Sequence, residues 1–241
     1  MSEPLVVAVM LLHDGREQMA RKTIECFRAQ TYPKRMMLIV DSRPGDVEES
    51  FYSEGVAHRW APDWHDMTVG ALRNAANGSA IEFCEPEIIA HFDSDDYSSP
   101  ERLAEQVALL QASGADAVGY REALFFREDG GEAWLYKQRA PKYALGGTLC
   151  YWRKTWEEKP FPDLMTGEDT AWIEGLNVVG ISGVPDQNYM APEPPRFIAR
   201  IHAGNTSKAY KPELMRAVQA QSGEWQRVPG WDHYCRGVMA L

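Results

Sequence analysis

The sequence has few cysteines, and they are scattered along the chain. Of its 241 residues only four are cysteine, at Cys26, Cys84, Cys150 and Cys235. No two of them have the CxxC spacing of a zinc knuckle, and they are too few and too far apart for a disulfide-stabilised scaffold. We therefore expect a reducing, cytoplasmic environment.

Long apolar segments and an excess of basic charge are also missing. The longest strongly apolar run covers residues 5–12, which is too short to cross a bilayer, and the residues before it lack the features of a signal peptide. Lys and Arg total 25 against 35 Asp and Glu, which gives a net charge of −10. An acidic chain lacks the electrostatic footprint of a general nucleic-acid binder, so nucleic acid is not an expected partner.

The sequence does contain alternating strand and helix patterns. Residues 5–12 are apolar throughout, as in a strand that is buried on both faces. Apolar side chains then recur on one face of a predicted helix over 16–30, and a second apolar run over 36–40 ends at Asp41. Strand, helix and strand in this order predict a βαβ unit with parallel strands.

The alternation continues beyond this unit. Strands are predicted over 56–60 and 88–92, and Thr68 is a predicted N-cap of the helix between them. Ser99 and Pro100 are typical of the N-cap and first position of a further helix. This half of the chain is therefore predicted to form a Rossmann-like α/β sheet.

The second half, after Gly114 ends that helix, is less regular. Strands are predicted over 123–126, 134–136, 147–152 and 197–202, the last of them half-buried, and helices over 168–176 and 212–221. Because no clean linker separates the halves, we predict a single domain over 1–241, with functional halves at 1–114 and 115–241.

Acidic residues follow three of the predicted strands. They are Asp14 (beside His13), then Asp41, and then Asp93, Asp95 and Asp96. The carboxyl ends of parallel strands meet at one edge of a sheet, which is where ligands bind. Crowded carboxylates repel one another unless a cation intervenes, and hard oxygen ligands suit Mg²⁺ or Mn²⁺, which often also hold phosphates. The pattern predicts a metal-bound, phosphorylated substrate.

The segment 93–96 has other interpretations. Its short acids also suit a turn whose side chains bond their own backbone. An EF-hand is excluded because loop position six is not glycine and position twelve is not acidic. A phosphatase of haloacid-dehalogenase type, with Asp93 as its nucleophile, is closer, but Tyr97 stands where that motif has threonine or valine.

Several segments, in the right order, resemble family 2 glycosyltransferases of the GT-A fold. Residues 91–103, HFDSDDYSSPERL, resemble the DxD segment of this family. The other matching segments are 5–41 (nucleotide-binding unit), 70–74 (GxxRN segment), 146–153 (strand before the acceptor loop), 167–169 (ED motif) and 200–207 (late histidine segment). The resemblance implies an α/β GT-A fold, with a Rossmann-like nucleotide-binding half, a mainly parallel sheet flanked by helices, and a smaller acceptor-binding half.

The resemblance also implies an activity: metal-dependent, inverting transfer of a sugar from a nucleotide-diphosphate donor, most often a UDP-sugar, to the hydroxyl of a saccharide or other acceptor. It implies that Asp95 and His202 bind Mn²⁺ or Mg²⁺, and that Asp93 orients the ribose or the water shell of the metal. As general base, Asp169 would take the proton of the acceptor hydroxyl.

On the donor side, the resemblance implies that Asp41 accepts a hydrogen bond from the base or ribose and that Arg73 balances phosphate charge. Ser94 lies in the donor-binding motif. Two stretches, 12–16 and 41–45, depart from the pattern of the family, and both belong to the nucleotide side.

Each assignment has a plainer alternative. Asp169 could place a negative charge at a helix N-terminus, and His202 could be an ordinary polar residue at a strand end. A non-catalytic module that binds sugar nucleotides is a further possibility, although such a module needs no general base. Trp152 and Trp156 are predicted to stack on a sugar ring in the acceptor groove.

Overall fold

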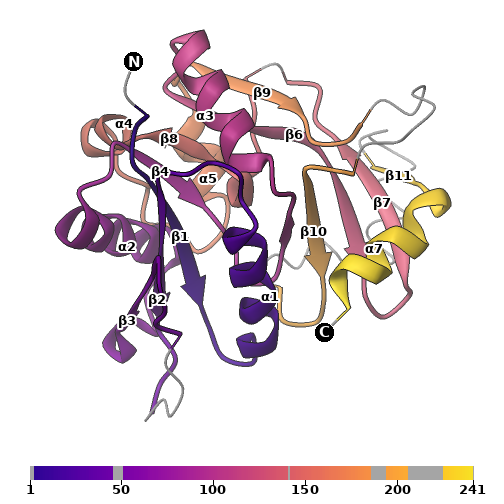
Figure 1. The fold of residues 1–241 in the computed structure, drawn as a ribbon, viewed down its shortest axis with the longest axis horizontal. Coiled ribbons are helices and arrows are strands. Elements are labelled where there is room, and N and C mark those ends of the chain that lie inside the picture. The colour runs from indigo at the N-terminus through magenta and orange to yellow at the C-terminus, as the bar shows by residue number, and fades with distance from the viewer. Residues whose placement is uncertain (1–2, 46–50, 141, 186–193, 206–224, 241) are drawn as a thin grey trace.

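The computed structural model describes residues 3–45, 51–140, 142–185, 194–205 and 225–240. One mixed sheet runs through the molecule, with helices on both of its faces (Figure 1). The strands are β1 (Val6–Leu12), β2 (Arg35–Asp41), β3 (Val56–Trp60), β4 (Ile88–His91), β5 (Tyr97–Ser98), β6 (Ala117–Arg127), β7 (Glu132–Lys137), β8 (Cys150–Trp152), β9 (Val178–Ser182), β10 (Phe197–Ile201) and β11 (Trp225–Arg227). The α-helices are α1 (Glu17–Arg28), α2 (Val69–Cys84), α3 (Arg102–Ser113), α4 (Arg153–Glu158), α5 (Glu168–Ile173) and α7 (Asp232–Met239).

The first half of the chain forms the predicted parallel sheet. Strands β4, β1, β2 and β3 are neighbours in this order, and each pair is parallel. Every residue of β1 is buried, because alternate side chains face α1 and α3 on one side and α2 and α5 on the other. This burial on both faces explains the unbroken apolar run and confirms the predicted βαβ unit.

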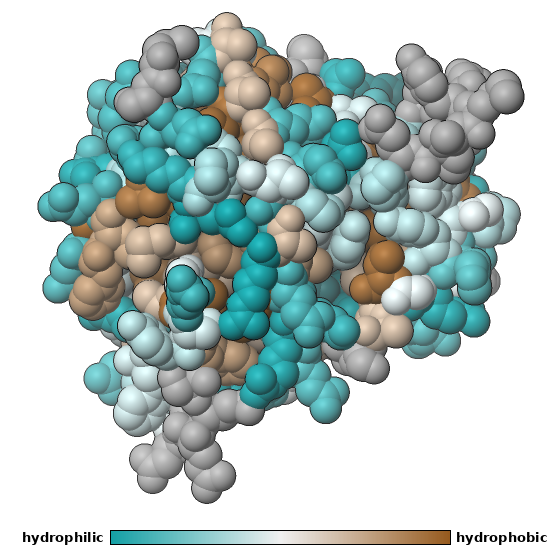
Figure 2. Space-filling model, in the orientation of Figure 1, coloured by the Kyte–Doolittle hydropathy of each residue, from teal (hydrophilic) through white to brown (hydrophobic). Residues whose placement is uncertain are grey.

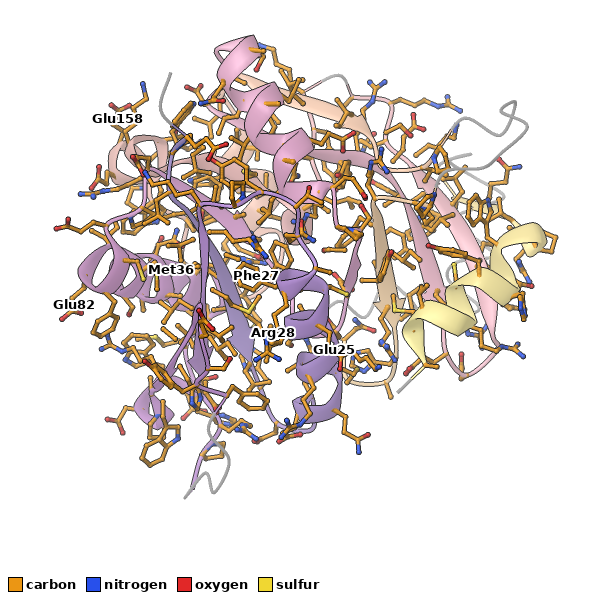
Figure 3. The ribbon with its side chains drawn as sticks, viewed as in Figure 1. Glu25, Phe27, Arg28, Met36, Glu82 and Glu158 are labelled. Carbon is orange, nitrogen blue, oxygen red and sulfur yellow. The ribbon has the colours of Figure 1, made fainter. Side chains whose placement is uncertain are left out.

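Helix α1 shows how one amphipathic helix covers the sheet. Phe27 is buried and meets the ring of Phe92 edge-on, with 6.0 Å between the ring centroids. Glu25 and Arg28, from the same turns of the helix, are exposed (Figure 3). The apolar periodicity of the sequence therefore gives the buried face of α1 correctly.

The predicted helix boundaries are partly right. Thr68 caps α2 as predicted, because its hydroxyl oxygen accepts a hydrogen bond from the backbone N–H of Ala71 at 3.1 Å. Helix α3, however, begins at Arg102 rather than directly after Ser99, because the intervening residues form a turn in which the Arg102 N–H donates to the Ser99 carbonyl. Gly114 ends α3 in the left-handed region with a φ of 63°.

The second half is organised around β6, which pairs with β7, β8, β9 and β10 along its length. The strand predicted over 147–152 is too long, since Gly146–Thr148 form a 3-10 turn, η2, and only β8 is extended. The prediction that β10 is half-buried is wrong: every position is buried, and the polar member of the strand, Arg200, is satisfied by internal partners.

Five of the described strands and α-helices are absent from the sequence-based prediction, namely β5, β9, β11, α4 and α7. Helix α7 lies across β6 and β7 (Figure 1), and its buried residues Cys235 and Met239 belong to the same apolar cluster as residues of those strands. Short elements such as these carry too few apolar repeats to give a clear period. The helix predicted over 212–221 lies outside the described residues.

The face of the molecule in Figure 2 is mostly hydrophilic, and its apolar residues are gathered in small groups, including one over α2. On that helix Phe83 is 57% exposed. Within the described part of the chain, no helix combines the length and the apolar character that a membrane span requires.

Gly70 fixes the contact between α2 and the loop before α5. A Cβ at this position would lie 1.9 Å from the carbonyl oxygen of Pro162, and the Gly70 N–H donates to the Leu164 carbonyl at 3.0 Å. We expect Gly70→Ala to lower the free energy of unfolding by about 1–3 kcal/mol, because a backbone atom cannot move aside as a side chain can. Urea denaturation measures this loss.

Gly78 provides the matched control in the same helix. It is exposed, and a Cβ at this position would meet nothing within 4 Å. Gly78→Ala should therefore stabilise the protein by up to ~1 kcal/mol through helix propensity alone. Equal stability of the two variants would show that the Gly70 contact does not constrain the loop.

Candidate active site

The carboxyl ends of β1 and β4 face a cavity of about 360 Å³. Its polar lining includes Arg16, Arg73, Asp93, Asp95, Asp96 and Asp169. Four of these are predicted site residues, and they come from both halves of the chain. The structure thus brings the predicted metal ligand Asp95 and the predicted base Asp169 to one cavity.

Asp95 is the point at which three segments meet. Its Oδ2 lies 2.9 Å from the Nε2 of His202, which follows β10, and 3.1 Å from the Nη1 of Arg16, which precedes α1. Burial alone would raise the pKa of Asp95, but the hydrogen bond from His202 and the charge of Arg16 outweigh it and hold that pKa below its usual value. The predicted proximity of Asp95 and His202 is therefore present in the structure.

The His202 ring has a defined orientation. The backbone N–H of Gly204 donates to its Nδ1 at 3.2 Å, so Nδ1 carries the lone pair and Nε2 faces Asp95. Nε2 therefore carries the proton that it directs at Asp95; to ligate an ion it would have to present its lone pair instead, which places the proton on Nδ1 and gives up the hydrogen bond from Gly204.

The two flanking acids differ from Asp95. Burial raises the pKa of Asp93, and the neighbouring Asp95 charge adds to this effect against the opposing charge of Arg73. Burial and the charges of Asp95 and Asp93 likewise raise the pKa of Asp96, although its Oδ1 accepts a hydrogen bond from the Arg200 N–H at 2.9 Å. Burial is the largest cause of both shifts, so removal from water disfavours the charged form of both carboxyls.

Arg200 holds the turn that contains Asp95 and Asp96 by its backbone. Its Nε donates to the Asp95 carbonyl at 3.0 Å, and its Nη2 donates to the Met239 carbonyl at the end of α7 at 2.7 Å. Its Nη1 pairs with Glu128. A buried arginine with these partners fixes the backbone of the turn relative to the last described helix.

Arg73 connects the two acidic segments. From α2, its Nε donates to Glu168 at 3.1 Å, and its Nη2 lies 3.8 Å from Asp93. The side chain is buried and borders the cavity. The arrangement supports a role in holding Asp93 and α5 in place; the predicted contact with phosphate stays a prediction.

Two glycines allow the acidic segments to approach each other. A Cβ on Gly146 would lie 2.2 Å from Oδ2 of Asp169, and a Cβ on Gly147 would lie 2.6 Å from Oδ2 of Asp93. Both glycines belong to the η2 turn, so only a turn without side chains at these positions leaves room for both carboxylates.

A buried hydrogen-bond chain holds that turn in place. Asn77 donates to the Tyr151 hydroxyl at 2.8 Å, that hydroxyl lies 3.1 Å from Nε2 of His91, and Nδ1 of His91 lies 2.8 Å from the Gly146 carbonyl. Burial and the charge of Arg73 hold the pKa of His91 well below its usual value, so the ring is neutral and donates one proton, to Gly146. Sequence reasoning missed this chain, because its members have no shared spacing.

Asp169 lies in the first turn of α5. Its Oδ1 accepts a hydrogen bond from the Thr170 N–H at 2.7 Å, while the residue is half-buried at the cavity wall. The alternative interpretation of Asp169, a negative charge at a helix N-terminus, fits this hydrogen bond, which engages one of the two carboxylate oxygens. The other oxygen, Oδ2, lies beside Gly146 at the cavity wall.

Asp41 has a different environment. It is fully buried, and its carboxylate accepts hydrogen bonds from Arg43 (Nε 2.9 Å, Nη2 2.7 Å) and from Nε2 of His58 at 3.1 Å. Burial would raise the pKa of Asp41, but these bonds outweigh it and hold the pKa far below its usual value. The predicted contact with the base or ribose stays a prediction, and it would require Arg43 to move.

Ser94 and the two predicted aromatic residues do not border this cavity. Ser94 is fully buried, so the predicted part of its side chain in donor binding stays a prediction that its position does not favour. Trp152 packs against the core, and Trp156 donates to Asn74 at 2.8 Å. The aromatic lining consists instead of Phe125, Tyr143 and Phe197.

His13 is a further residue to which the sequence analysis assigned no role. Its Nδ1 lies 3.2 Å from the Ser42 hydroxyl, and the Ser42 carbonyl lies 3.1 Å from Nδ1 of His65. The two histidines therefore flank the end of β2, on the nucleotide side of the predicted site. The signal in the sequence that could have found these two histidines is their position shortly after the ends of β1 and β3.

The donor set suits a divalent cation that a substrate helps to hold. Within the described residues, no three His, Cys, Asp or Glu side chains are grouped to hold an ion by themselves. Mg²⁺ and Mn²⁺ typically take one or two protein ligands together with substrate phosphates. One carboxylate oxygen and one imidazole nitrogen, from Asp95 and His202, meet that requirement.

The Asp41 network gives a prediction about pH. Because the folded pKa of Asp41 lies below the unfolded value of about 3.9, its carboxylate stabilises the protein above about pH 4, and this contribution is lost as the pH falls further. We expect Asp41→Asn to lower the free energy of unfolding by about 3–5 kcal/mol at pH 7, and the gap to narrow below about pH 4. Urea denaturation across this pH range measures it.

An exposed pair serves as the control. Asp129, whose side chain is 68% exposed, pairs with Arg127, so Asp129→Asn should cost less than ~1 kcal/mol at pH 7. A loss at Asp41→Asn that does not change with pH would contradict the assigned direction of the pKa shift.

The structure resembles solved glycosyltransferases at low sequence identity. S. aureus TarS 1–349 in complex with UDP-GlcNAc aligns with a TM-score of 0.60 and 15% identity over 90% of this chain and 66% of that one. The mannosyltransferase PcManGT from Pyrobaculum calidifontis, in complex with GDP-Man and Mn²⁺, aligns with a TM-score of 0.53 and 15% identity over 78% of this chain and 59% of that one. The chain spans 39% of a longer TarS structure.

No curated protein sequence matches this chain significantly. The family model described as Glycosyl transferase family 2 matches residues 8–162, which is more than half of the sequence and runs from within β1 to beyond β8. With the GT-A fold of its structural neighbours and a cavity at the carboxyl ends of the parallel strands, the chain belongs to glycosyl transferase family 2.

Proposed function

We propose that this protein is a metal-dependent, inverting glycosyltransferase that uses a nucleotide-diphosphate sugar. The observation that carries the proposal is the contact of 2.9 Å between Asp95 and His202 at a cavity that Asp169 also borders. A metal-binding pair and a separate carboxylate at one cavity are the groups that this chemistry needs. In this assignment, residues 1–114 supply the donor side and residues 115–241 the acceptor side.

Asp95 and His202 are the residues that would hold Mn²⁺ or Mg²⁺. The ion, when bound, neutralises the diphosphate leaving group as a Lewis acid. Asp93, on the same turn, would orient the donor ribose or a water on the ion. Arg200 and Arg73 hold this turn and its neighbours in place and so limit its movement during the reaction.

Asp169 is the proposed general base. Its Oδ1 is fixed by the Thr170 N–H, which leaves Oδ2 to accept the proton of an acceptor hydroxyl as that oxygen attacks the anomeric carbon. The attacking oxygen forms the new glycosidic bond while the bond to the diphosphate breaks. A single displacement of this kind inverts the anomeric carbon.

Uracil is the proposed base of the donor nucleotide. TarS, in its complexes with UDP-GlcNAc and with UDP, aligns over 90% of this chain, whereas PcManGT, in complex with GDP-Man, aligns over 78%. The nucleotide side of this chain departs from the family pattern at 12–16 and 41–45, so titration with nucleotides that differ in their base tests this choice directly.

Calorimetric titration with UDP, GDP, CDP and dTDP, each in Mn²⁺ and in EDTA, tests the donor site. We expect UDP to bind in Mn²⁺ and the binding to disappear in EDTA, since the phosphates and the two protein ligands hold the ion together. Binding of a different nucleotide instead of UDP would show that the donor carries the base of that nucleotide. No binding under any condition would refute the transferase function.

The role of Asp169 is tested by donor turnover without an acceptor. We expect Asp169→Asn to retain UDP binding in Mn²⁺ and to lower the rate of UDP-hexose hydrolysis by about 10²–10⁴-fold, because water then takes the place of the acceptor hydroxyl and no base remains to accept its proton. Release of UDP, followed by chromatography, measures the rate.

Glu158→Gln is the matched control, since Glu158 is an exposed acid on α4, away from the cavity (Figure 3). It should hydrolyse the donor at the wild-type rate. If Asp169→Asn hydrolyses the donor at the wild-type rate, Asp169 is not the general base. The proposed donor site does not depend on this result.

A further inference from the structure

Arg16 contacts the same Asp95 oxygen that would bind the metal ion in the proposed site. Its Nη1 lies 3.1 Å from Oδ2 of Asp95, the same oxygen that His202 approaches to 2.9 Å. Its Nη2 donates to the Gly204 carbonyl at 2.8 Å, so one guanidinium bridges the turn after β4 and the loop after β10. The side chain is 13% exposed and borders the cavity.

This position makes Arg16 a competitor of any cation at Asp95. A guanidinium and a divalent cation at the same carboxylate oxygen repel each other, and partial burial strengthens the repulsion relative to water. The two directions from which Oδ2 is approached are taken by Arg16 and His202. A cation that keeps the His202 ligand therefore has to displace Arg16.

Arg16 borders the cavity in which the diphosphate of a donor would lie. It lies directly before α1, next to Gly15, whose φ of 74° is in the left-handed region and whose Cβ direction is open. A nucleoside diphosphate bound through an ion at Asp95 would bring its phosphate oxygens within the reach of this side chain. Arginine binds such oxygens with two parallel hydrogen bonds.

We propose that Arg16 alternates between two partners, pairing with Asp95 until a divalent cation binds there and then with the diphosphate of the donor. The inference rests on the proposed function and adds an order of binding to it. Arg16 weakens cation binding in the absence of nucleotide and strengthens nucleotide binding in its presence. Cation and nucleotide are then coupled, each raising the affinity for the other.

The proposal predicts changes of opposite sign in one variant. In titrations with Mn²⁺ alone, Arg16→Gln should bind the ion about 3–10-fold more tightly than the wild type, because the competing charge is gone. In titrations with UDP at saturating Mn²⁺, the same variant should bind about tenfold more weakly, because the charged hydrogen bonds to phosphate are lost. Calorimetry measures both affinities.

Two further variants sharpen the comparison. Arg16→Lys retains the charge but not the planar fork, so it should bind Mn²⁺ as the wild type does and UDP more weakly. Arg28→Gln removes the same charge from the exposed side of α1, where Arg28 donates to the Ser53 hydroxyl at 2.6 Å (Figure 3), and it should change neither affinity.

The outcomes separate this inference from the proposed function. If Arg16→Gln leaves Mn²⁺ affinity unchanged, or weakens Mn²⁺ and UDP binding together, Arg16 merely supports the site and the inference is overturned, while UDP binding by the wild type still supports the transferase. If the wild-type protein binds Mn²⁺ but no nucleotide, the proposed function fails and the second position of Arg16 fails with it.

Discussion

Removing the Asp95 carboxylate from water costs free energy that only charge and hydrogen bonds from the protein can offset. Asp95 is 5% exposed, and its carboxylate is compensated by Arg16 before α1 and His202 after β10, while Arg200 holds its backbone carbonyl. These groups belong to segments that are distant in sequence. Arg16 and His202 are constrained by the same carboxylate oxygen, and Arg200 by the backbone carbonyl of the same residue, so the packing of β10 beside β6 also fixes these contacts.

The glycine turn η2 imposes a complementary constraint on the other side of the cavity. Asp93 and Asp169 approach the turn more closely than any side chain at Gly146 or Gly147 would allow. Arg102, fully buried at the start of α3, donates to the Gly147 carbonyl at 3.0 Å and to the His91 carbonyl at 2.7 Å. The buried cations of this protein thus hold backbone carbonyls around the site as well as carboxylates.

Sequence patterns predicted the parallel half of the fold because its strands are continuously apolar and its helices have a regular apolar face. Short acids at strand ends and the order of family-like segments can be read in one dimension, and they pointed to Asp93, Asp95, Asp169 and His202; the structure brings these residues to one region, and their roles stay predictions. The partners of these residues could not be found in this way. Arg16, Arg200 and His91 act through contacts across the fold, and no local spacing distinguishes them from other buried or surface residues.

The long separation in sequence between the residues of the site has a consequence for how the protein folds. His202 reaches Asp95 across 107 positions of the chain, whereas β1, α1 and β2 are neighbours both in sequence and in the sheet. Contacts between distant segments form late, because closing a long loop costs conformational entropy before any contact repays it. A chain that has completed only its first βαβ unit therefore lacks the site altogether. Ligands that bind Asp95 and His202 together would recognise the finished molecule only, and would stabilise it against unfolding by mass action.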